Sequence, residues 1–503
     1  MKSMKGSLLK GASWLSAVNI LSTALGFVST LVLARLLVPE DFGIVAIAVS
    51  IAGIAETLTH LSLSQALLQN KNPEEHHFDT AWTLGLARSV LIGLAFVAVS
   101  EPLAQLYGDA RLTPVILVLA MSTALGGLAS PRTVVFERNL VFWHRFVLDT
   151  ISRIIGFAVS LTIALVYESY WALVLGVISS QISRVALSYV LAPYVPKLGL
   201  KGCKALISFS GWMTAAGWIG ALNSKSDALI LGAFVSPTLL GFYSMGERVV
   251  AMTSSGLIQP VGQLLFPAFS RIQDDRKRLN DAYLRSQALI CMLAFPAGAG
   301  LSWLADPAIT LALGEKWSAA IPIVQVFAIT SALLTIQHSQ PLAMALGQTK
   351  AVFARHLRIF LVRMPLYLGG ILMGEATAVG ALMGAVYGHA ASQVINLFWN
   401  MTLVKQLSGL GLYWQFRNCC RSALATAVMI AALYLLQQNF TFGTSAAAEA
   451  AYVGGTVLVG ALTYGATLAL IWLAQKRPSG PESELFHAGQ LAAARIFIRD
   501  GKA

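Results

Sequence analysis

The stretch VPEDFG at residues 38–43 returns as SPTLLG at residues 236–241, with the proline and the glycine at the same spacing. Sliding the chain by 198 positions without a gap also aligns residues on both sides of this turn: Trp14 with Trp212, Leu31 with Leu229, Leu33 with Leu231 and Gln65 with Gln263. Two apolar stretches of similar length flank the turn in each copy. The alignment favours an internal repeat over a chance match in a chain of biased composition.

The composition indicates the class of protein in which this repeat occurs. Of the 503 residues, 56% are hydrophobic and only 12% are charged, whereas soluble proteins carry about 25% charged residues. Apolar stretches of about 20 residues, long enough to cross a bilayer as a helix, recur between Gly11 and Ala474. We therefore expect an all-α polytopic membrane protein with about 14 spans, and not the short alternating strands of an outer-membrane barrel.

The basic residues report the orientation of these spans. About 26 of the 35 Lys and Arg residues lie in the N-terminus, in every second loop and in the C-terminal tail, while the opposite loops contain Arg35, Arg111 and Lys316. This asymmetry is the positive-inside rule, which predicts that both termini are cytoplasmic. The net charge of +12 is then explained by topology, so we expect no nucleic acid as a partner.

The length of the repeat constrains the architecture. A unit of 198 residues contains six expected spans, and an even number returns the chain to the same side of the membrane. The two copies should therefore be parallel repeats related by an axis along the membrane normal, an arrangement of transporters that bind their substrate at the repeat interface. The last two expected spans lie outside the repeat.

Charged side chains within the expected spans are the candidate site residues, because each costs about 2.5–3.5 kcal/mol to insert and usually faces a cavity or a partner. The candidate substrate-binding cations are Arg88, Arg153, Lys225, Arg248 and Arg363. The candidates for ion coupling or a charge network are Glu56, His60, Asp149, Asp227 and Glu247. The slight excess of cations over carboxylates favours an anionic cargo such as a pyrophosphate.

Lys225 and Asp227 lie two positions apart, which is about 200° around a helix, so they need two different polar environments. Our hypothesis is that Lys225 meets an anionic group in a central cavity. Asp227 would then belong to a network on the bundle side or to ion coupling. An ion-pair lock within the bundle is the alternative for both residues.

The other charged residues have structural alternatives as well. Glu56 and His60 are four residues apart and could share a proton or a plain hydrogen bond. Asp149 and Arg153 have the same spacing and could neutralise each other.

Charges near a membrane surface form a separate group. Glu247, Arg248 and Arg363 lie close enough to an expected surface for a long side chain to reach water. Arg88 lies deeper in its expected span and is the better cavity candidate.

Enzyme and metal signatures do not emerge from the chain. The expected spans contain no P-loop, G-x-S-x-G or H-E-x-x-H pattern, so we expect a transporter without catalytic residues, cofactor or bound metal. The four cysteines include no C-x-x-C pair and predict neither a zinc site nor a disulfide framework.

Three stretches resemble a known family. They are GASWLSAVNILSTALGFVSTLVLARLLVPEDFGIVAIA (residues 11–48), SQALLQNKNPEEHHFDTAWTLGLARSV (residues 64–90) and LILGAFVSPTLLGFYSMGERV (residues 229–249). Over about residues 8–410 the chain resembles the polysaccharide and oligosaccharide-lipid flippases. These belong to the multidrug/oligosaccharidyl-lipid/polysaccharide exporter superfamily.

The resemblance implies a V-shaped pair of six-helix bundles, with an N-lobe at residues 1–205 and a C-lobe at residues 206–408. An extra transmembrane pair would occupy residues 409–475 and a cytoplasmic tail residues 476–503. The implied function is alternating-access transport of an undecaprenyl-pyrophosphate-linked oligosaccharide, a repeat unit of exopolysaccharide or lipopolysaccharide. It would cross from the cytoplasmic to the periplasmic leaflet of the bacterial inner membrane, coupled to an ion or to the membrane potential. The expected partners are this lipid-linked glycan, membrane lipid and, further, the polysaccharide polymerase and export machinery.

Three alternatives stay open. A cation-coupled multidrug exporter of the same superfamily would favour an acidic, aromatic cavity. A lipid II flippase would share the count of fourteen spans. A membrane glycan polymerase or ligase would need a large extracytoplasmic loop, whereas the expected loops on that side are mostly shorter than about 15 residues.

Overall fold

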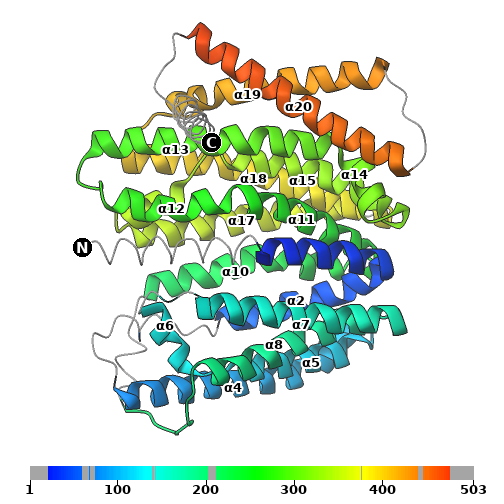
Figure 1. Ribbon diagram of the computed structural model, residues 1–503, viewed down its shortest axis with the longest axis vertical. Helices are drawn as coiled ribbons and strands as arrows, with labels where there is room; N and C mark the ends of the chain where they lie inside the picture. Colours follow the sequence, from blue (N-terminus) through cyan, green and yellow to red (C-terminus); the bar gives the residue numbers. More distant parts are fainter. Residues whose placement is uncertain are drawn as a thin grey trace, which may run out of the picture. The chain divides into compact units, whose positions relative to one another are not determined.

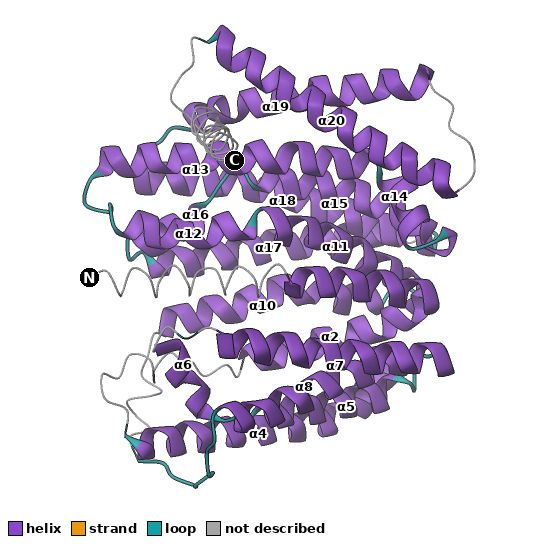
Figure 2. Cartoon of the chain, in the orientation of Figure 1, coloured by secondary structure: helices purple, strands orange, loops and turns teal. Residues whose placement is uncertain are grey.

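The computed structural model describes residues 21–58, 67, 74–138, 141, 143–201, 211–374, 376–439 and 446–475. Every regular element in these ranges is a helix, which confirms the prediction of an all-α chain (Figure 2). Among the described residues, nine helices are long and apolar enough to cross a membrane. Two shorter apolar helices, Leu21–Leu36 and Leu112–Gly126, accompany them. The count of about 14 spans stays a prediction.

The chain folds into two compact units (Figure 1). Unit 1 contains residues 1–248, 313–320 and 353–388, and unit 2 contains residues 249–312, 321–352 and 389–503. The lobe boundaries at residues 205 and 408 stay a prediction.

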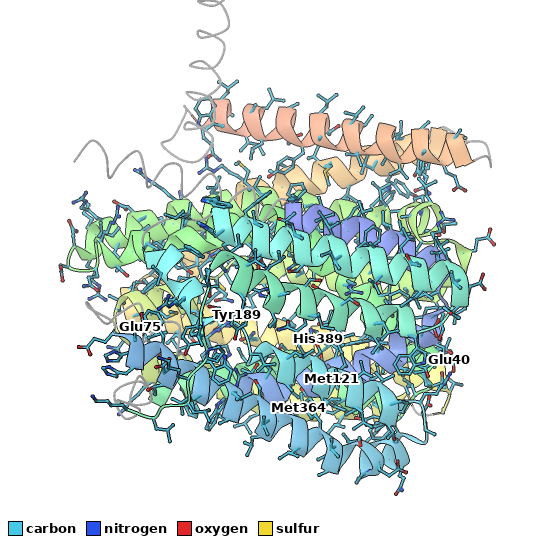
Figure 3. All side chains as sticks on the ribbon, turned by 60° about the horizontal axis from the view of Figure 1, so that its bottom comes forward. Glu40, Glu75, Met121, Tyr189, Met364 and His389 are labelled. Carbon is cyan, nitrogen blue, oxygen red and sulfur yellow. The ribbon has the colours of Figure 1, made fainter. Side chains whose placement is uncertain are left out.

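Unit 1 is built from the following elements: the helix Leu21–Leu36, α2 (Pro39–Leu58), α4 (Glu75–Tyr107), α5 (Leu112–Gly126), η1 (Pro131–Thr133), α6 (Val134–Arg138), α7 (Trp143–Tyr167), α8 (Trp171–Leu191), α10 (Gly211–Gly232) and η2 (Glu315–Ala320). Three helices contribute to both units: α11 (Pro237–Leu257), α17 (Thr349–Met373) and α18 (Ala378–Ser408). Glu40 and Glu75, near the starts of α2 and α4, lie at opposite ends of this group of helices (Figure 3).

The two copies of the repeated turn meet each other within unit 1. Pro39 and Pro237 each begin a helix, α2 and α11, because proline fits the first helical turn. A Cβ atom on Gly43 would lie 1.8 Å from the carbonyl oxygen of Pro237. A Cβ atom on Gly241 would lie 1.8 Å from that of Pro39. This reciprocal contact is what two copies related by a two-fold axis produce, and it explains why both positions are glycine.

The segment η2 binds the C-terminal end of the helix Leu21–Leu36. Lys316 Nζ donates hydrogen bonds to the carbonyl oxygens of Arg35 and Leu37, at 2.8 and 2.6 Å. The buried indole of Trp317 donates to the carbonyl oxygen of Ala34 at 2.9 Å. Helix C-termini leave carbonyl groups without partners and favour a positive charge, so η2 satisfies both needs.

A loop ion cluster joins α2 to the connection between α4 and α5. Arg111 donates to both carboxylate oxygens of Asp109, at 2.8 and 3.0 Å, and pairs with Glu40. This guanidinium holds the pKa of Asp109 below its usual range. Gly108, with a φ of +66°, ends α4 in the left-handed conformation that favours glycine.

Unit 2 contains α12 (Gln259–Ser270), α13 (Arg276–Trp303), α14 (Ala305–Ala312), α15 (Ile321–Leu334), α16 (Ser339–Ala345), α19 (Leu412–Asn439) and α20 (Ala446–Ala474), together with parts of the shared helices. The helices of the predicted extra pair, α19 and α20, pack on α13. Met292, Met429 and Tyr464 form part of their common buried cluster. The Tyr464 hydroxyl donates to the carbonyl oxygen of Met292 at 2.8 Å and fixes this arrangement.

One face of α18 carries a chain of polar side chains. His389 (labelled in Figure 3) and the amide of Gln393 lie 3.1 Å apart, and Asn396 donates to Gln393 at 3.4 Å. Asn400 donates to Asn396 at 2.5 Å and accepts from the hydroxyl of Ser339, on α16, at 3.1 Å. The bond between Ser339 and Asn400 joins α16 to α18, as polar side chains do between helices in a membrane.

Candidate site: two connected basic cavities in unit 1

Small residues bring α7 and α8 unusually close together. A Cβ atom on Gly156 would lie 2.8 Å from the Gly176 carbonyl oxygen, and one on Gly176 would lie 1.8 Å from Ser160 Oγ. Such residues let helices approach closely in lipid, and Figure 1 shows the two helices side by side. Asp149 lies about two turns before Gly156 and Arg184 about two turns after Gly176. The antiparallel contact therefore places this carboxylate opposite this guanidinium.

The larger cavity has a volume of about 840 Å³ and is lined by α2, α4, α5, α8 and α10 with the segment at residues 129–134. Three basic side chains line it, Arg88, Arg184 and Lys225, together with one acidic side chain, Glu56. Hydroxyl and amide groups of α4, α5 and α8 complete the polar part of its wall.

Lys225 and Arg88 both reach the segment of α2 between Gly53 and Glu56. The Lys225 side chain passes over Gly53, where an added Cβ atom would lie 3.3 Å from its Cε. Arg88 donates a 2.8 Å hydrogen bond to the main-chain carbonyl of Glu56. Both side chains also line the larger cavity, so two positive charges are available to a multivalent anion there.

The smaller cavity has a volume of about 380 Å³ and lies between the helix Leu21–Leu36, α7, α8 and α11, with Phe42 of α2 at its edge. Its charged lining residues are Asp149, Arg153, Arg184 and Arg248. Val177, Gln181 and Arg184 line both cavities, so the two spaces adjoin along α8. Together they present five basic and two acidic side chains.

The carboxylate of Asp149 does not pair with Arg153, the i,i+4 partner that the sequence suggests. It forms ion pairs with Arg184, at 3.0 Å, and with Arg145, at 3.6 Å. The close packing of α7 on α8 offers a guanidinium across the helix interface. Arg153 is left exposed to the cavity.

Asp227 and Arg363 form a separate, buried site between α10, α11 and α17. Arg363 donates to the carboxylate of Asp227 and to the carbonyl of Asn223. The Tyr243 hydroxyl donates to the same carboxylate at 3.0 Å, and that of Tyr367 donates to the Asp227 carbonyl at 3.2 Å. This placement differs from the expectation that Arg363 is a cavity cation. A carboxylate that is 3% exposed needs a counter-charge, and Arg363 supplies it.

Lys225 and Asp227 thus occupy two environments. Lys225 lines the larger cavity, whereas Asp227 belongs to the buried network of the helix bundle. Glu247, next to Arg248 on α11, is exposed. His60, and with it the suggested pairing with Glu56, lies outside the described residues. Whether any of these residues binds cargo or couples an ion stays a prediction.

Arg184 and Gln181 are the cavity residues that sequence reasoning missed. Both lie inside the expected span at residues 171–192, where an arginine is as costly as the five cations that were recognised. The signal was therefore present. Arg184 lies well inside its span, and Gln181 three residues earlier shares its helix face.

Comparison with known proteins gives concordant matches. The model of a family described as polysaccharide biosynthesis protein matches residues 32–322. The lipopolysaccharide biosynthesis protein WzxC of Escherichia coli (strain K12) is 23% identical over 411 residues, covering 79% of this chain and 81% of that protein. The succinoglycan biosynthesis transport protein ExoT of Rhizobium meliloti (strain 1021) is 27% identical over 315 residues, covering 62% and 63%.

A solved structure shares the fold. The lipid II flippase MurJ, in an inward closed conformation, superposes with a TM-score of 0.70 at 15% sequence identity. The match covers 92% of this chain and 99% of that one. The helical architecture is thus that of a known flippase.

Proposed function

The chain belongs to the polysaccharide biosynthesis protein family, and from this membership we propose that it is a flippase for a lipid-linked oligosaccharide. The cargo is an undecaprenyl-pyrophosphate-linked repeat unit of an exopolysaccharide or lipopolysaccharide. It moves from the cytoplasmic to the periplasmic leaflet of the bacterial inner membrane by alternating access, driven by an ion gradient or the membrane potential. Both termini are cytoplasmic, and the polysaccharide polymerase and export machinery receive the product.

The charge of the two cavities carries this proposal. Five basic side chains against two acidic ones leave an excess of positive charge in the lining of the two cavities. Pyrophosphate oxygens accept charge-assisted hydrogen bonds from arginine and lysine, which are about twice as strong as neutral ones. The printed names of the relatives, which concern lipopolysaccharide biosynthesis and succinoglycan transport, support a glycan as the cargo.

The charges of the two cavities also bear on the alternative functions. A multidrug exporter for organic cations would be served by an acidic cavity, whereas the excess here is basic. Lipid II also carries a pyrophosphate, and the fold shared with its flippase makes it the second candidate cargo. The similar proteins named as transporters and flippases support a transporter over an enzyme.

Neutralising the cations of the larger cavity tests the proposal. We expect Lys225→Gln and Arg88→Gln each to weaken binding of undecaprenyl-pyrophosphate-linked oligosaccharide by about 10- to 100-fold. A hydrogen bond to a charged group contributes about 1.5–3 kcal/mol, and 1.4 kcal/mol is a factor of ten. Binding is measured on purified protein. Export is followed as surface polysaccharide together with cytoplasm-facing lipid-linked oligosaccharide in a strain that lacks the chain and is rescued with each variant.

The matched control is Lys277→Gln, which removes an exposed lysine of α13 from unit 2 and should leave binding and export unchanged. Normal binding by both cavity variants would show that the cargo site is elsewhere. If a strain without the protein exports glycan normally but becomes sensitive to drugs, the cargo is a drug and not a glycan.

A further inference from the structure

We infer that Asp149 is a resident counter-ion of the cargo site, which holds Arg184 between transport events and competes with the cargo for it. The inference rests on the proposed function, because it assigns a release mechanism to the same pair of cavities. Arg184 then binds the cargo anion, and Asp149 pairs with Arg184 again when the cargo leaves.

The placement of the two side chains supports such an exchange. Arg184 lines both cavities, whereas Asp149 lines only the smaller one. The guanidinium remains 53% exposed although its Nη2 lies 3.0 Å from Asp149 Oδ1, while the Asp149 side chain is only 15% exposed. The contact is an ion pair in which Asp149 Oδ1 accepts no hydrogen bond from the described residues. A guanidinium has five N–H donors, so Arg184 keeps donors for an anion in the larger cavity that it also lines.

The second partner of Asp149 lowers the energetic cost of the exchange. Removing one member of a buried ion pair is costly because it leaves an uncompensated charge. When an anion in the larger cavity draws Arg184 away, Arg145 remains 3.6 Å from the Asp149 carboxylate. Arg153 and Arg248 line the same small cavity and add positive charge around it. The helix Leu21–Leu36 and α2 contribute only uncharged residues to this wall.

The ion pair between Asp149 and Arg184 affects how fast the cargo is released. An arginine without a counter-ion would hold a pyrophosphate tightly, and differences in affinity between related complexes lie mostly in the dissociation rate. The Asp149 carboxylate, 3.0 Å from Arg184, offers the guanidinium an ion pair as the anion leaves. Asp149 therefore lowers the affinity for the cargo and speeds its departure.

The test is the affinity of Asp149→Asn for the cargo. If Asp149 only stabilised the fold, this change would weaken binding, whereas the inference predicts tighter binding. We expect Asp149→Asn to bind undecaprenyl pyrophosphate about tenfold more tightly than the wild type, within the usual range of coupling between two sites, and to release it more slowly. Export should fall although the amount of protein in the membrane is unchanged. Affinity and dissociation rate are measured on the purified full chain, with inorganic pyrophosphate as a second probe.

Two further variants separate competition from other effects. Arg184→Gln should bind more weakly than the wild type, and Asp149→Asn combined with Arg184→Gln should bind like Arg184→Gln alone, because the two residues act through one contact. The matched control is Arg145→Gln, which also deprives Asp149 of an ion-pair partner but leaves Arg184 in place. It should not tighten binding.

The outcomes are decisive. Equal or weaker binding by Asp149→Asn, at normal melting temperature, overturns the inference while the proposed function stands. Should this variant fail to accumulate, Asp149→Ser removes the same carboxylate, and the same tightening is required of it. If the wild type binds neither lipid-linked oligosaccharide nor undecaprenyl pyrophosphate, the proposed function itself fails.

Discussion

Gly43→Ala is expected to destabilise the folded protein by about 3 kcal/mol, and the same change at Gly241 by a similar amount. Forcing extra atoms into a well-packed interior costs about 1–3 kcal/mol, occasionally more. Both glycines belong at the upper end of this range because the added Cβ atom meets a main-chain carbonyl oxygen at 1.8 Å. A flexible side chain could turn away, whereas two helix N-termini must separate.

Melting temperature in detergent extracts, read as the monodisperse fraction after heating, measures the effect. The control is Gly217→Ala on α10, where an added Cβ atom has no neighbour within 4 Å. Alanine at an open helical position is favoured over glycine by up to about 1 kcal/mol, so this variant should melt at or above the wild-type temperature. Equal melting of Gly43→Ala and the wild type would contradict the reciprocal contact of the two turns.

Arg363→Gln should cost about 3–5 kcal/mol of folding stability, because it leaves the carboxylate of Asp227 buried without its counter-charge. Tyr243→Phe removes one hydrogen bond to that carboxylate and should cost less, about 1.5–3 kcal/mol. Combining Asp227→Asn with Arg363→Gln should restore part of the loss, since no charge is then left alone. The three variants are compared by melting temperature and by the amount of protein in the membrane.

Arg358→Gln is the matched control for this series. Arg358 lies on the same helix, α17, but is exposed, so its loss should change stability by less than about 0.5 kcal/mol. If Arg363→Gln melts like the wild type but no longer binds lipid-linked oligosaccharide, Arg363 is a cavity cation, as its sequence context first indicated. The buried network would then describe a state that the cargo disrupts.

Much of the fold follows from short-range features of the sequence. Apolar stretches of about 20 residues predict membrane helices because an isolated helix satisfies its own backbone in lipid. The spacing of Pro39 and Gly43, repeated at Pro237 and Gly241, predicts two equivalent turns, and the structure brings these turns together. The two-residue separation of Lys225 and Asp227 correctly requires two environments, because helix geometry alone sets it.

The partners of the buried charges depend on contacts between distant segments and could not be predicted in this way. Spacing within one helix offers Asp149 both Arg145 and Arg153, and of these two only Arg145 forms an ion pair with it. The closer partner, Arg184, comes from the neighbouring helix, whose close packing depends on Gly156 and Gly176. Arg363 was expected near a membrane surface because nothing in its local sequence identifies Asp227, on another helix, as its partner.

The Asp227–Arg363 pair also sets an order of events during synthesis of the protein. Arg363 follows Asp227 by 136 residues, which at about 5–20 residues per second is a delay of roughly 7 to 27 seconds. Throughout this interval the Asp227 carboxylate of α10 lacks the guanidinium of Arg363. The helix α10 is also less apolar than the nine helices of the described ranges that could span a membrane. The buried pair can therefore form only after α17 has been synthesised, so α10 reaches its final electrostatic environment later than the helices before it.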